Sequence, residues 1–473
     1  MFRPRSIGII ALLIFCAAIA GCRSGGTGIT NQTTTAGNSS VILTMTDTPP
    51  SNVSILSAEV TLTGATLNPG NVPLFSGSTT VELTRLETDI AYIGASSNVP
   101  AGTYTTLTLT FANPLLTIEN DTTAAIGTCA VGLICNMPPT TVANLSTTIT
   151  LTSFSVAANS SMGLLVDVNL NNLLSATLGE DFTAGTTVKS FTPAGTGAPL
   201  VGAEDVVGQV TALSATNNTF SITNATGTYS LAVNSSSTFF QFPSTLCTTS
   251  TIACLQTNQI VSVDIGIGST GAIVARNVVF EDADSSDTEV EGFITGTNAG
   301  LQQFSIVTLD LSATGTGLNI GGVATVQYAI TPATPFVIDF AHADNVAVST
   351  TGFLFASPAD LSVGQEVSIR RNSTSSGNTI IADRVMLRSS RIMATVHTIG
   401  SPYINLYNAP FIFSGNGITA IQVLTSTPTI YSESNIAKIF TDVFVSGVVS
   451  VRGPLFNVSG TRTLVATKVV LVP

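Results

Sequence analysis

The six cysteines have the most distinctive chemistry in this sequence. Four of them form two close pairs, Cys129 with Cys135 and Cys247 with Cys254, in Thr-, Gly- and Pro-rich stretches typical of loops. Neither pair has CxxC spacing and no histidine lies nearby, so we expect two disulfides rather than metal ligands. Disulfides persist in oxidising compartments, so the pairs indicate export. Each bridge closes a short loop and contributes only ~2.4 kcal/mol in the chain-entropy model, so it stiffens a loop rather than holding the fold together.

The N-terminus has the pattern of an export signal. Two arginines precede an apolar stretch, residues 7–20, which is shorter than the roughly 20 residues of a membrane-spanning helix. This stretch ends in Ile19-Ala-Gly-Cys22, which resembles the lipobox of bacterial lipoproteins. The resemblance implies a signal peptide over residues 1–21 and a lipidated Cys22 as the first residue of the mature chain. An ordinary secretory signal, cut just before a free Cys22, is the alternative.

The segment behind Cys22 predicts a tethered protein. Residues 22–40 are rich in Gly, Ser, Thr and Asn without apolar periodicity, which is typical of a flexible linker. Several acyl chains on one cysteine anchor a protein stably, because each buried CH₂ contributes roughly 0.8 kcal/mol. Arg23 stands where lipoproteins of the inner membrane typically have Asp, so the resemblance favours the outer membrane or cell surface. The membrane is thus one expected partner, with envelope polysaccharides and other envelope proteins as further candidates.

The densest acidic run lies at residues 281–291. Asp282, Asp284, Asp287 and Glu289 offer the hard oxygen ligands that Ca²⁺ prefers. Their spacing departs from the EF-hand loop, and the glycine at its sixth position is missing. Calcium is therefore the weaker interpretation, and a solvated linker between two domains is the expected one.

Motifs for catalysis are few. Residues 266–271 spell GxGxxG, but apolar alternation on both sides predicts a hairpin turn rather than a dinucleotide site, which requires a following helix. The two histidines fall in an expected loop (His342) and on an alternating strand (His397), and no serine has a GxSxG setting. We therefore expect no catalytic residue, no cofactor and a non-enzymatic role. An enzyme with an unrecognised site is the less favoured alternative.

One strand near the C-terminus has the residue types of a sugar-binding surface. In residues 403–407, Tyr403, Asn405 and Tyr407 alternate with two apolar residues, so the three polar side chains share one face. Phenol rings can stack on sugar C–H faces and the amide can bond hydroxyl groups. Pro402 suggests a position at a sheet edge, where a ligand has access. The alternative is that tyrosine is simply a good strand former.

Composition excludes several classes of protein. Only 9% of the 473 residues are charged, which disfavours helical bundles, and pI 4.5 with net charge −12 disfavours binding to nucleic acid. The charge is uneven: residues 41–369 have 3 basic and 24 acidic side chains, whereas residues 370–473 have 9 basic and 3 acidic. This asymmetry predicts that the last domain docks on something anionic, either lipopolysaccharide phosphate or the acidic domains of the same chain. Chance, together with a need for solubility, is the alternative.

Period-2 alternation of apolar residues with Thr or Ser predicts strands along most of the chain. Residues 204–473 contain an internal repeat, in which Ala275, Ala382 and Ala466 occupy the same place in three similar strands. Each unit has about five or six expected strands, the content of a small closed barrel. The predicted domains are a β-sandwich followed by three barrels, with these boundaries: residues 41–190, 204–283, 289–390 and 391–473.

Two families of unknown function resemble these units. The barrels look like the domain-of-unknown-function family numbered five-six-six-six, through an opening Gly208-Gln-Val-Thr and a closing Ile273-Val-Ala-Arg-Asn-Val. The preceding segment is similar to family four-three-eight-two, in Thr46-Asp-Thr-Pro49, Pro100-Ala-Gly-Thr-Tyr104 and Leu164-Leu-Val-Asp-Val168. The resemblance implies an all-β protein on a lipid tether. Neither family has an established activity, so we expect a binding or structural role at the cell envelope, with polysaccharide recognition as the alternative.

Overall fold

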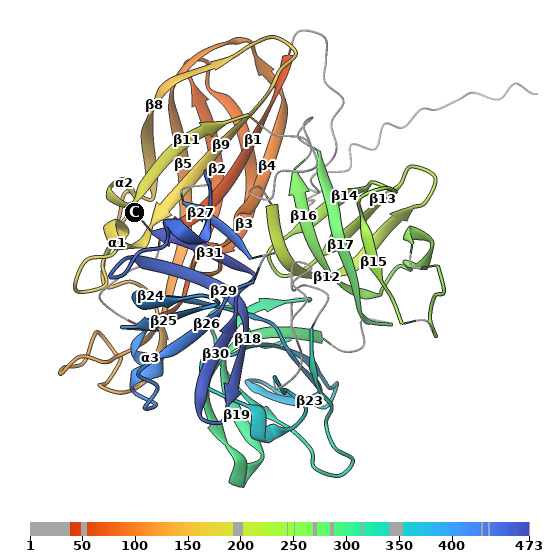
Figure 1. Ribbon diagram of the computed structural model, residues 1–473. Coiled ribbons are helices and arrows are strands. Elements are labelled where there is room, and N and C mark those ends of the chain that lie inside the picture. The colour runs from red at the N-terminus through yellow and green to blue at the C-terminus, as the bar shows by residue number, and fades with distance from the viewer. Residues whose placement is uncertain are drawn as a thin grey trace, which may run out of the picture.

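The computed structural model describes residues 38–48, 54–192, 202–243, 245–249, 251–267, 272–283, 288–313, 316–339, 353–426, 429–433 and 436–472. The predicted signal peptide (residues 1–21), Cys22 and the tether up to residue 37 lie outside these ranges. The protein is all-β, with an N-terminal sheet-rich unit and three small closed barrels, as the alternating pattern predicts (Figure 1). None of the helices in the described part of the chain has the length and apolar character needed to cross a membrane.

The N-terminal unit is a β-sandwich. One sheet has the order β11-β9-β1-β4; the other has the order β3-β2-β5-β6, with β8 also paired to β5. These strands are β1 (Asn38–Thr48), β2 (Ser54–Asn68), β3 (Val72–Glu82), β4 (Ala91–Pro100), β5 (Gly102–Glu119), β6 (Ile134–Met137), β8 (Ser146–Val156), β9 (Ser161–Asn169) and β11 (Thr186–Phe191). Short elements complete the unit: η1 (Thr84–Glu87), β7 (Val142–Ala143), α1 (Leu170–Leu173), β10 (Glu180–Asp181) and α2 (Phe182–Gly185). Leu43 of β1 and Leu62 of β2, both fully buried, belong to the core between the two sheets.

Three barrels follow, in chain order. Barrel 1 consists of β12 (Gly202–Ser214), β13 (Thr219–Thr223), β14 (Thr228–Val233), β15 (Phe239–Gln241), η2 (Ile252–Cys254), β16 (Ile260–Ile267) and β17 (Ile273–Asp282). Barrel 2 consists of β18 (Thr288–Asn298), η3 (Ala299–Leu301), β19 (Gln303–Leu311), β20 (Val323–Gln327), β21 (Phe336–Ile338), η4 (Pro358–Asp360), β22 (Glu366–Arg371) and β23 (Thr379–Leu387). Barrel 3 consists of β24 (Ser389–Gly400), β25 (Tyr403–Tyr407), α3 (Phe411–Ser414), β26 (Ile421–Leu424), β27 (Ile430–Glu433), β28 (Ile436–Lys438), η5 (Phe440–Asp442), β29 (Val448–Val458), β30 (Thr461–Val465) and β31 (Lys468–Val472).

The barrels share one topology. The order β14-β13-β12-β16-β17-β15 in barrel 1 repeats as β20-β19-β18-β22-β23-β21 in barrel 2, and the parallel pairs β14–β17 and β20–β23 close them. In barrel 3 the closing strand is divided into β30 and β31, which pair in parallel with β26 and β27. The division lies opposite Gly453, where a Cβ atom would lie 1.9 Å from the carbonyl oxygen of Val465.

A threonine ties each closing strand in the same way. The hydroxyl of Thr238 donates to the carbonyl of Ala275 at 2.6 Å, and Thr334 and Thr429 donate to Ala382 and Ala466 at 3.1 and 2.9 Å. In each barrel a backbone N–H shortly before the threonine donates to the same hydroxyl oxygen. The alanines are those of the sequence repeat, so the repeat marks a structural joint.

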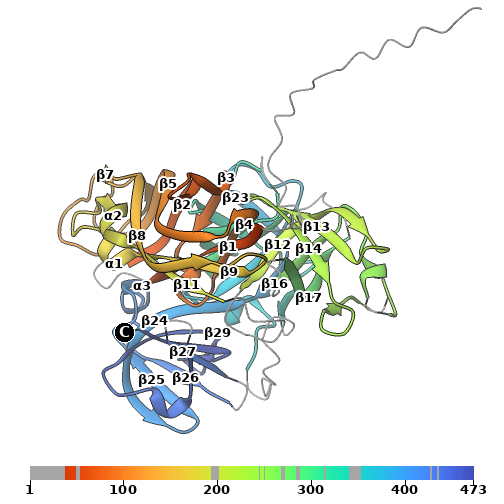
Figure 2. The ribbon, with the colours of Figure 1, turned by 90° about the horizontal axis from the view of Figure 1, so that it is seen from above.

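The four units pack against one another rather than lying apart on linkers (Figures 1 and 2). Ile42 and Tyr92 of the sandwich belong to the apolar core of barrel 1. Leu56 of the sandwich shares a core cluster with Leu309 of barrel 2 and Val451 of barrel 3. Burial of apolar surface therefore extends across the domain boundaries, and the charged side chains described next lie at the centre of these contacts.

Candidate functional site: a buried charged junction between the domains

The turn η1 carries charged residues of the sandwich into the space between the barrels. Glu82, at the end of β3, fixes this turn, because its carboxylate accepts hydrogen bonds from Thr84 Oγ1 (2.8 Å), the N–H of Arg85 (2.9 Å) and the N–H of Ala58 (2.9 Å). Charge-assisted bonds to a turn are among the stronger hydrogen bonds in proteins. The following residues, Arg85, Glu87 and Asp89, are thus held in a defined orientation toward the barrels.

Asp89 is buried among three cations of barrel 3. Arg391 contacts its Oδ2 atom through Nη2 (2.6 Å) and Nε (3.1 Å), and Arg452 Nη1 and Lys468 Nζ lie 3.9 and 3.8 Å from Oδ1. Burial raises the pKa of Asp89, but Arg452, Arg391 and Lys468 outweigh this effect and hold the pKa well below its usual range. The carboxylate therefore stays ionised and joins the sandwich to barrel 3.

Arg391 also bridges to barrel 2. Its Nη1 atom lies 2.6 Å from Glu366 Oε2, and its own N–H donates to Glu366 Oε1 at 3.1 Å. One arginine thus contacts carboxylates of two other domains, and its side chain is only 4% exposed. A buried charge of this kind is tolerated only when its partners are retained.

Arg85 makes the reverse connection, from the sandwich to barrel 2. Its Nη2 and Nη1 atoms lie 3.0 Å from Glu291 and 3.4 Å from Asp310. Burial, which outweighs the attraction to Arg85, raises the pKa of Asp310 to about 7. Tyr229 of barrel 1 lies half-buried beside this group and shares a 3.0 Å hydrogen bond with Thr226. All four domains therefore contribute to the junction.

A second cluster joins barrels 1 and 2. Glu281 and Glu289 are almost completely buried, and Arg384 Nη2 contacts both, at 2.6 and 2.9 Å. Arg388 adds ion pairs to Glu281, to Glu291 and to Asp339. The guanidinium groups neutralise carboxylates that face one another across the boundary.

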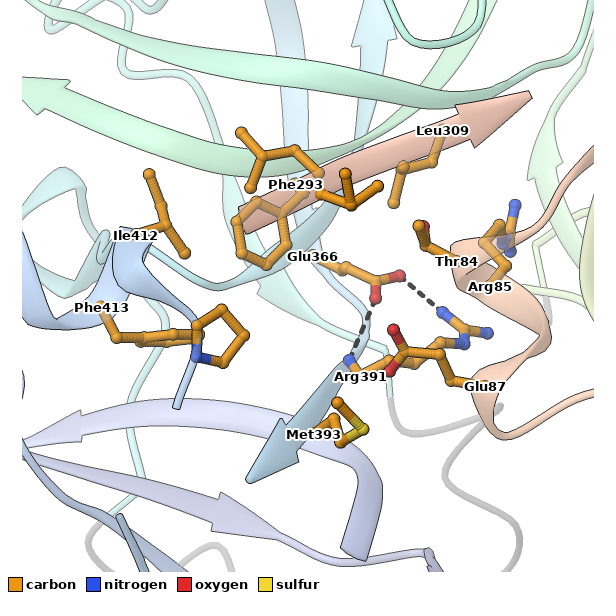
Figure 3. Close-up of a pocket in the computed structure, with 13 residues that line it drawn as sticks. Thr84, Arg85, Glu87, Phe293, Leu309, Glu366, Arg391, Met393, Ile412 and Phe413 are labelled. Atoms are coloured by element: carbon orange, nitrogen blue, oxygen red, sulfur yellow. Dashed lines mark hydrogen bonds and ion pairs between the residues drawn. The ribbon is translucent and has the colours of Figure 1, made fainter. Parts of the chain in front are cut away.

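A small cavity lies at the centre of the junction (Figure 3). Its polar wall is formed by Glu87, Glu366 and Arg391, and its apolar wall includes Phe293 and Phe413. The volume is about 60 Å³, which is room for a few water molecules, since one needs about 10–15 Å³. Burial raises the pKa of Glu87 to about 8, although Ser450 donates a 3.3 Å hydrogen bond to it. At neutral pH the cavity therefore contains a protonated carboxyl group beside an Arg–Glu ion pair.

Comparison with known families bears on the sandwich that presents Asp89. Residues 38–183 match the family described as Domain of unknown function (DUF4382). The match covers the segment in which the sequence showed that resemblance, and it ends before barrel 1. The matched segment includes the turn with Arg85, Glu87 and Asp89.

Other comparisons add little to the DUF4382 match. No curated protein is similar to the chain. One solved structure, a multidomain protein with nucleic acid binding domains from Streptococcus pneumoniae, is 9% identical over 55% of this chain and 72% of its own, with a TM-score of 0.10. A likeness at this level indicates neither a shared fold nor a shared function.

The junction accounts for the uneven distribution of charge along the chain. Six of the nine cationic residues in residues 370–473, all within the described ranges, form ion pairs with carboxylates of residues 41–369: Arg370, Arg384, Arg388, Arg391, Arg452 and Lys468. Barrel 3 itself docks on an acidic domain of the same chain through three of the six, because Arg391, Arg452 and Lys468 meet Asp89 of the sandwich. A contact with lipopolysaccharide phosphate, the other expected partner of the last domain, stays a prediction. The sequence alone did not show that half of these cations lie in barrel 2, nor which carboxylates they meet.

The acidic run takes part in the same junction. Asp282 pairs with Arg370 at 2.6 Å, and Glu289 contacts both Arg370 and Arg384; Asp284 and Asp287 lie outside the described residues. The expectation of a solvated linker is wrong at its two ends, because burial excludes water from Glu281 and Glu289. Within the described ranges, no group of three His, Cys, Asp or Glu side chains is placed to hold a metal ion.

Both predicted disulfides, Cys129–Cys135 and Cys247–Cys254, are confirmed. The GxGxxG motif begins in the last two residues of β16 and precedes its antiparallel partner β17, as predicted for a hairpin; residues 268–271 are outside the described ranges. His397 lies exposed on β24, and His342 is outside the described residues.

The tyrosine strand has the predicted alternation. In β25, Ile404 and Leu406 are buried in the core of barrel 3, whereas Tyr403 is 37% exposed and Asn405 and Tyr407 are half-buried. The expected edge position is wrong, because β25 pairs with β24 on one side and β26 on the other. Pro402 instead lies in the turn before β25, where no ladder hydrogen bond is required of it.

Sequence analysis missed one signal of the junction, a serine that recurs in three apolar strands. Val449-Ser-Val451 repeats Val261-Ser-Val263 and Val367-Ser-Ile369, and the central serines are fully buried. Two of these serines, Ser368 and Ser450, donate to Glu289 and Glu87. In two of the three strands the buried serine was therefore the available sign of a nearby carboxylate, whereas the hydroxyl of Ser262 has no hydrogen-bond partner among the described residues.

Proposed function

We propose that this chain is a lipid-anchored protein of the bacterial cell envelope with a binding or structural, non-catalytic role. The observation that carries the proposal is the junction, in which buried arginines connect the sandwich and the three barrels into one body. Such a body on a flexible tether suits the presentation of surfaces at a fixed geometry. The lipobox pattern ending in Cys22 and the two disulfides support export and anchoring.

The barrels fit the same proposal as three members of the family numbered five-six-six-six. Their common topology and the repeated pairs Thr238–Ala275, Thr334–Ala382 and Thr429–Ala466 support descent from one module. Duplication of a module enlarges the presented surface without a new fold.

Fractionation tests the anchor. We expect the wild-type protein to incorporate labelled palmitate and to remain with the outer membrane after cell lysis. Cys22→Ser should abolish labelling and release the protein into the soluble fraction, whereas Cys16→Ser, within the signal, should leave both unchanged. Membrane retention of Cys22→Ser together with an unlabelled wild type would contradict the proposal.

A second candidate function is recognition of a polysaccharide. It is favoured by one observation, the solvent-facing Tyr403, Asn405 and Tyr407 on β25 of barrel 3. In this view the junction serves to hold barrel 3 in a fixed orientation toward its ligand.

A further inference from the structure

The outer face of β24, β25 and β26 has more polar groups than the sequence alone predicted. Asn405 of β25 stands opposite Gln422 of β26, and both are half-buried on the solvent side of the sheet. On the other side, a register shift in β24 between Val396 and Thr398 turns His397 outward. Figure 2 places β25 and β26 at the edge of barrel 3 that faces away from the sandwich.

These side chains form a continuous row of rings and hydrogen-bonding groups. The rings of His397 and Tyr407 meet edge to face, with centroids 5.1 Å apart and an interplanar angle of 68°. Asn405 Nδ2 donates to Thr398 Oγ1 at 2.8 Å, which fixes the amide and leaves its carbonyl oxygen for another donor. At the other end, Tyr403 is the most exposed ring of the strand. The two tyrosines are separated by four residues, or roughly 13 Å at ~3.3 Å per residue.

The segment that supplies the side chains of this face has no Asp, Glu, Lys or Arg. Between Arg391 and Glu433 the sequence contains no Asp, Glu, Lys or Arg, although the whole chain has a net charge of −12. The nearest cation along the sheet is Arg462 of β30, which pairs with Ile421 and donates to Asn457, so the defining side chains of the face offer an anionic ligand no ion pair. The net charge of the protein as a whole would also repel such a ligand. Uncharged hydroxyl-rich chains have the matching chemistry, since rings can cover their C–H faces while amides and imidazole bond their hydroxyl groups.

We propose that this face, defined by Tyr403, Tyr407, His397, Asn405 and Gln422, binds a neutral polysaccharide. The tyrosines stack on sugar rings, and the amides and the histidine bond the hydroxyl groups between them. The inference rests on the second candidate function and narrows its ligand to uncharged glycans. It is independent of the lipid anchor, because the face lies in barrel 3 and involves no residue of the tether.

Affinity electrophoresis of the full mature chain tests the proposal. The protein is run through native gels containing dextran, mannan, xylan or galactomannan, with polygalacturonate as the anionic comparison. We expect retardation by at least one neutral polymer and none by polygalacturonate. Retardation by none of the neutral polymers, or by polygalacturonate alone, overturns the proposal.

Variants locate the binding surface. The double variant Tyr403→Ala, Tyr407→Ala should raise the apparent dissociation constant obtained from retardation at least tenfold. The double Tyr→Phe variant should bind nearly as well as the wild type, because stacking needs the ring and not the hydroxyl. Phe239→Ala, at a 61% exposed ring on β15 of barrel 1, is the matched control and should bind like the wild type. Equal retardation of the double alanine variant and the wild type would place any binding elsewhere and contradict the proposal. Palmitate labelling of Cys22 is scored separately, so failure of the glycan site is distinguishable from failure of the anchor.

Discussion

Arg391 and Asp89 are 302 residues apart in the chain, yet two nitrogens of the guanidinium contact a single carboxylate oxygen of Asp89 at 2.6 and 3.1 Å. The pair joins the first domain to the last, and both side chains are about 95% buried. An interaction that is so remote in sequence and so protected from water depends on how the sandwich and barrel 3 are placed relative to one another. The junction is therefore a result of the assembled chain rather than of any single domain.

Loss of the charge at Asp89 should be costly. Asp89→Asn leaves Arg391, Arg452 and Lys468 close together without their shared anion, and breaking a buried ion pair typically costs about 3–5 kcal/mol. We expect a decrease of this size in the free energy of unfolding, measured with urea. Asp383→Asn, at an exposed position on β23, should change it by less than about 0.5 kcal/mol. Equal effects of the two substitutions would show that the cations of barrel 3 do not depend on Asp89.

Stability should decline as the solution becomes alkaline. Burial raises the pKa of Glu87 and Glu180 to about 8, and that of Asp310 to about 7, above the ordinary values of 4.5 and 3.8. A carboxyl group whose pKa is higher in the folded than in the unfolded protein stabilises the fold through its protonated form. This contribution to the free energy of unfolding is complete at a pH below the unfolded-state pKa, and it is lost as the pH rises through the folded-state pKa. Each unit of difference corresponds to about 1.4 kcal/mol, so the free energy of unfolding should fall by a few kcal/mol between pH 5 and pH 9.

The variant Glu87→Gln isolates one contribution to this profile. Glutamine has the shape of the protonated acid and does not ionise, so the thermal midpoint of Glu87→Gln should depend less steeply on pH between 6 and 9 than that of the wild type. Asp89, whose pKa is lowered, has the opposite sign and loses its contribution only in strong acid. A profile of Glu87→Gln that parallels the wild type would contradict the assignment of a protonated Glu87 in the cavity.

The buried threonine that bonds to the closing strand of each barrel should contribute more to the free energy of unfolding than an exposed threonine hydroxyl does. Thr429→Val preserves shape but leaves the carbonyl of Ala466 and the N–H of Ser426 without their bonds to the hydroxyl. A buried polar group without a partner costs about 1–3 kcal/mol, so we expect a loss in this range. Thr461→Val, at an exposed site on β30, is the control and should be nearly neutral. The check is to compare the thermal unfolding midpoints of Thr429→Val and Thr461→Val with that of the wild type.

Gly453 should tolerate no side chain. A Cβ atom there would lie 1.9 Å from the carbonyl oxygen of Val465, so Gly453→Ala must displace β30 or β29 next to Arg452. Such overpacking typically costs about 1–3 kcal/mol and occasionally more. Gly400→Ala is the matched control, because its Cβ would meet nothing within 4 Å. A Gly453→Ala protein with wild-type urea stability would show that the close approach of β29 and β30 is absent in solution.

Local signals made much of this architecture predictable. Alternation of apolar residues with Thr and Ser identifies strands because burial on one face of a sheet has a period of two, and the repeated alanines mark the closing strands. Both disulfides followed from short spacing in loops. The ends of the acidic run at Glu281 and Glu289 were misread as solvated, because nothing near them in the sequence indicates the arginines about a hundred residues later. Pro402 was misread as an edge signal for the same reason, since strand neighbours are set by tertiary pairing.

A double-mutant cycle on Asp89 and Arg391 tests the central claim most directly. The free energy of unfolding is measured in urea for the wild type, Asp89→Asn, Arg391→Gln and the double variant. If the pair joins the sandwich to barrel 3 in a water-excluded junction, the two substitutions are strongly non-additive, with a coupling energy of about 1.5 kcal/mol or more. Additivity within about 0.5 kcal/mol would show that the two residues act independently and would contradict the account of four domains joined through a buried charged centre.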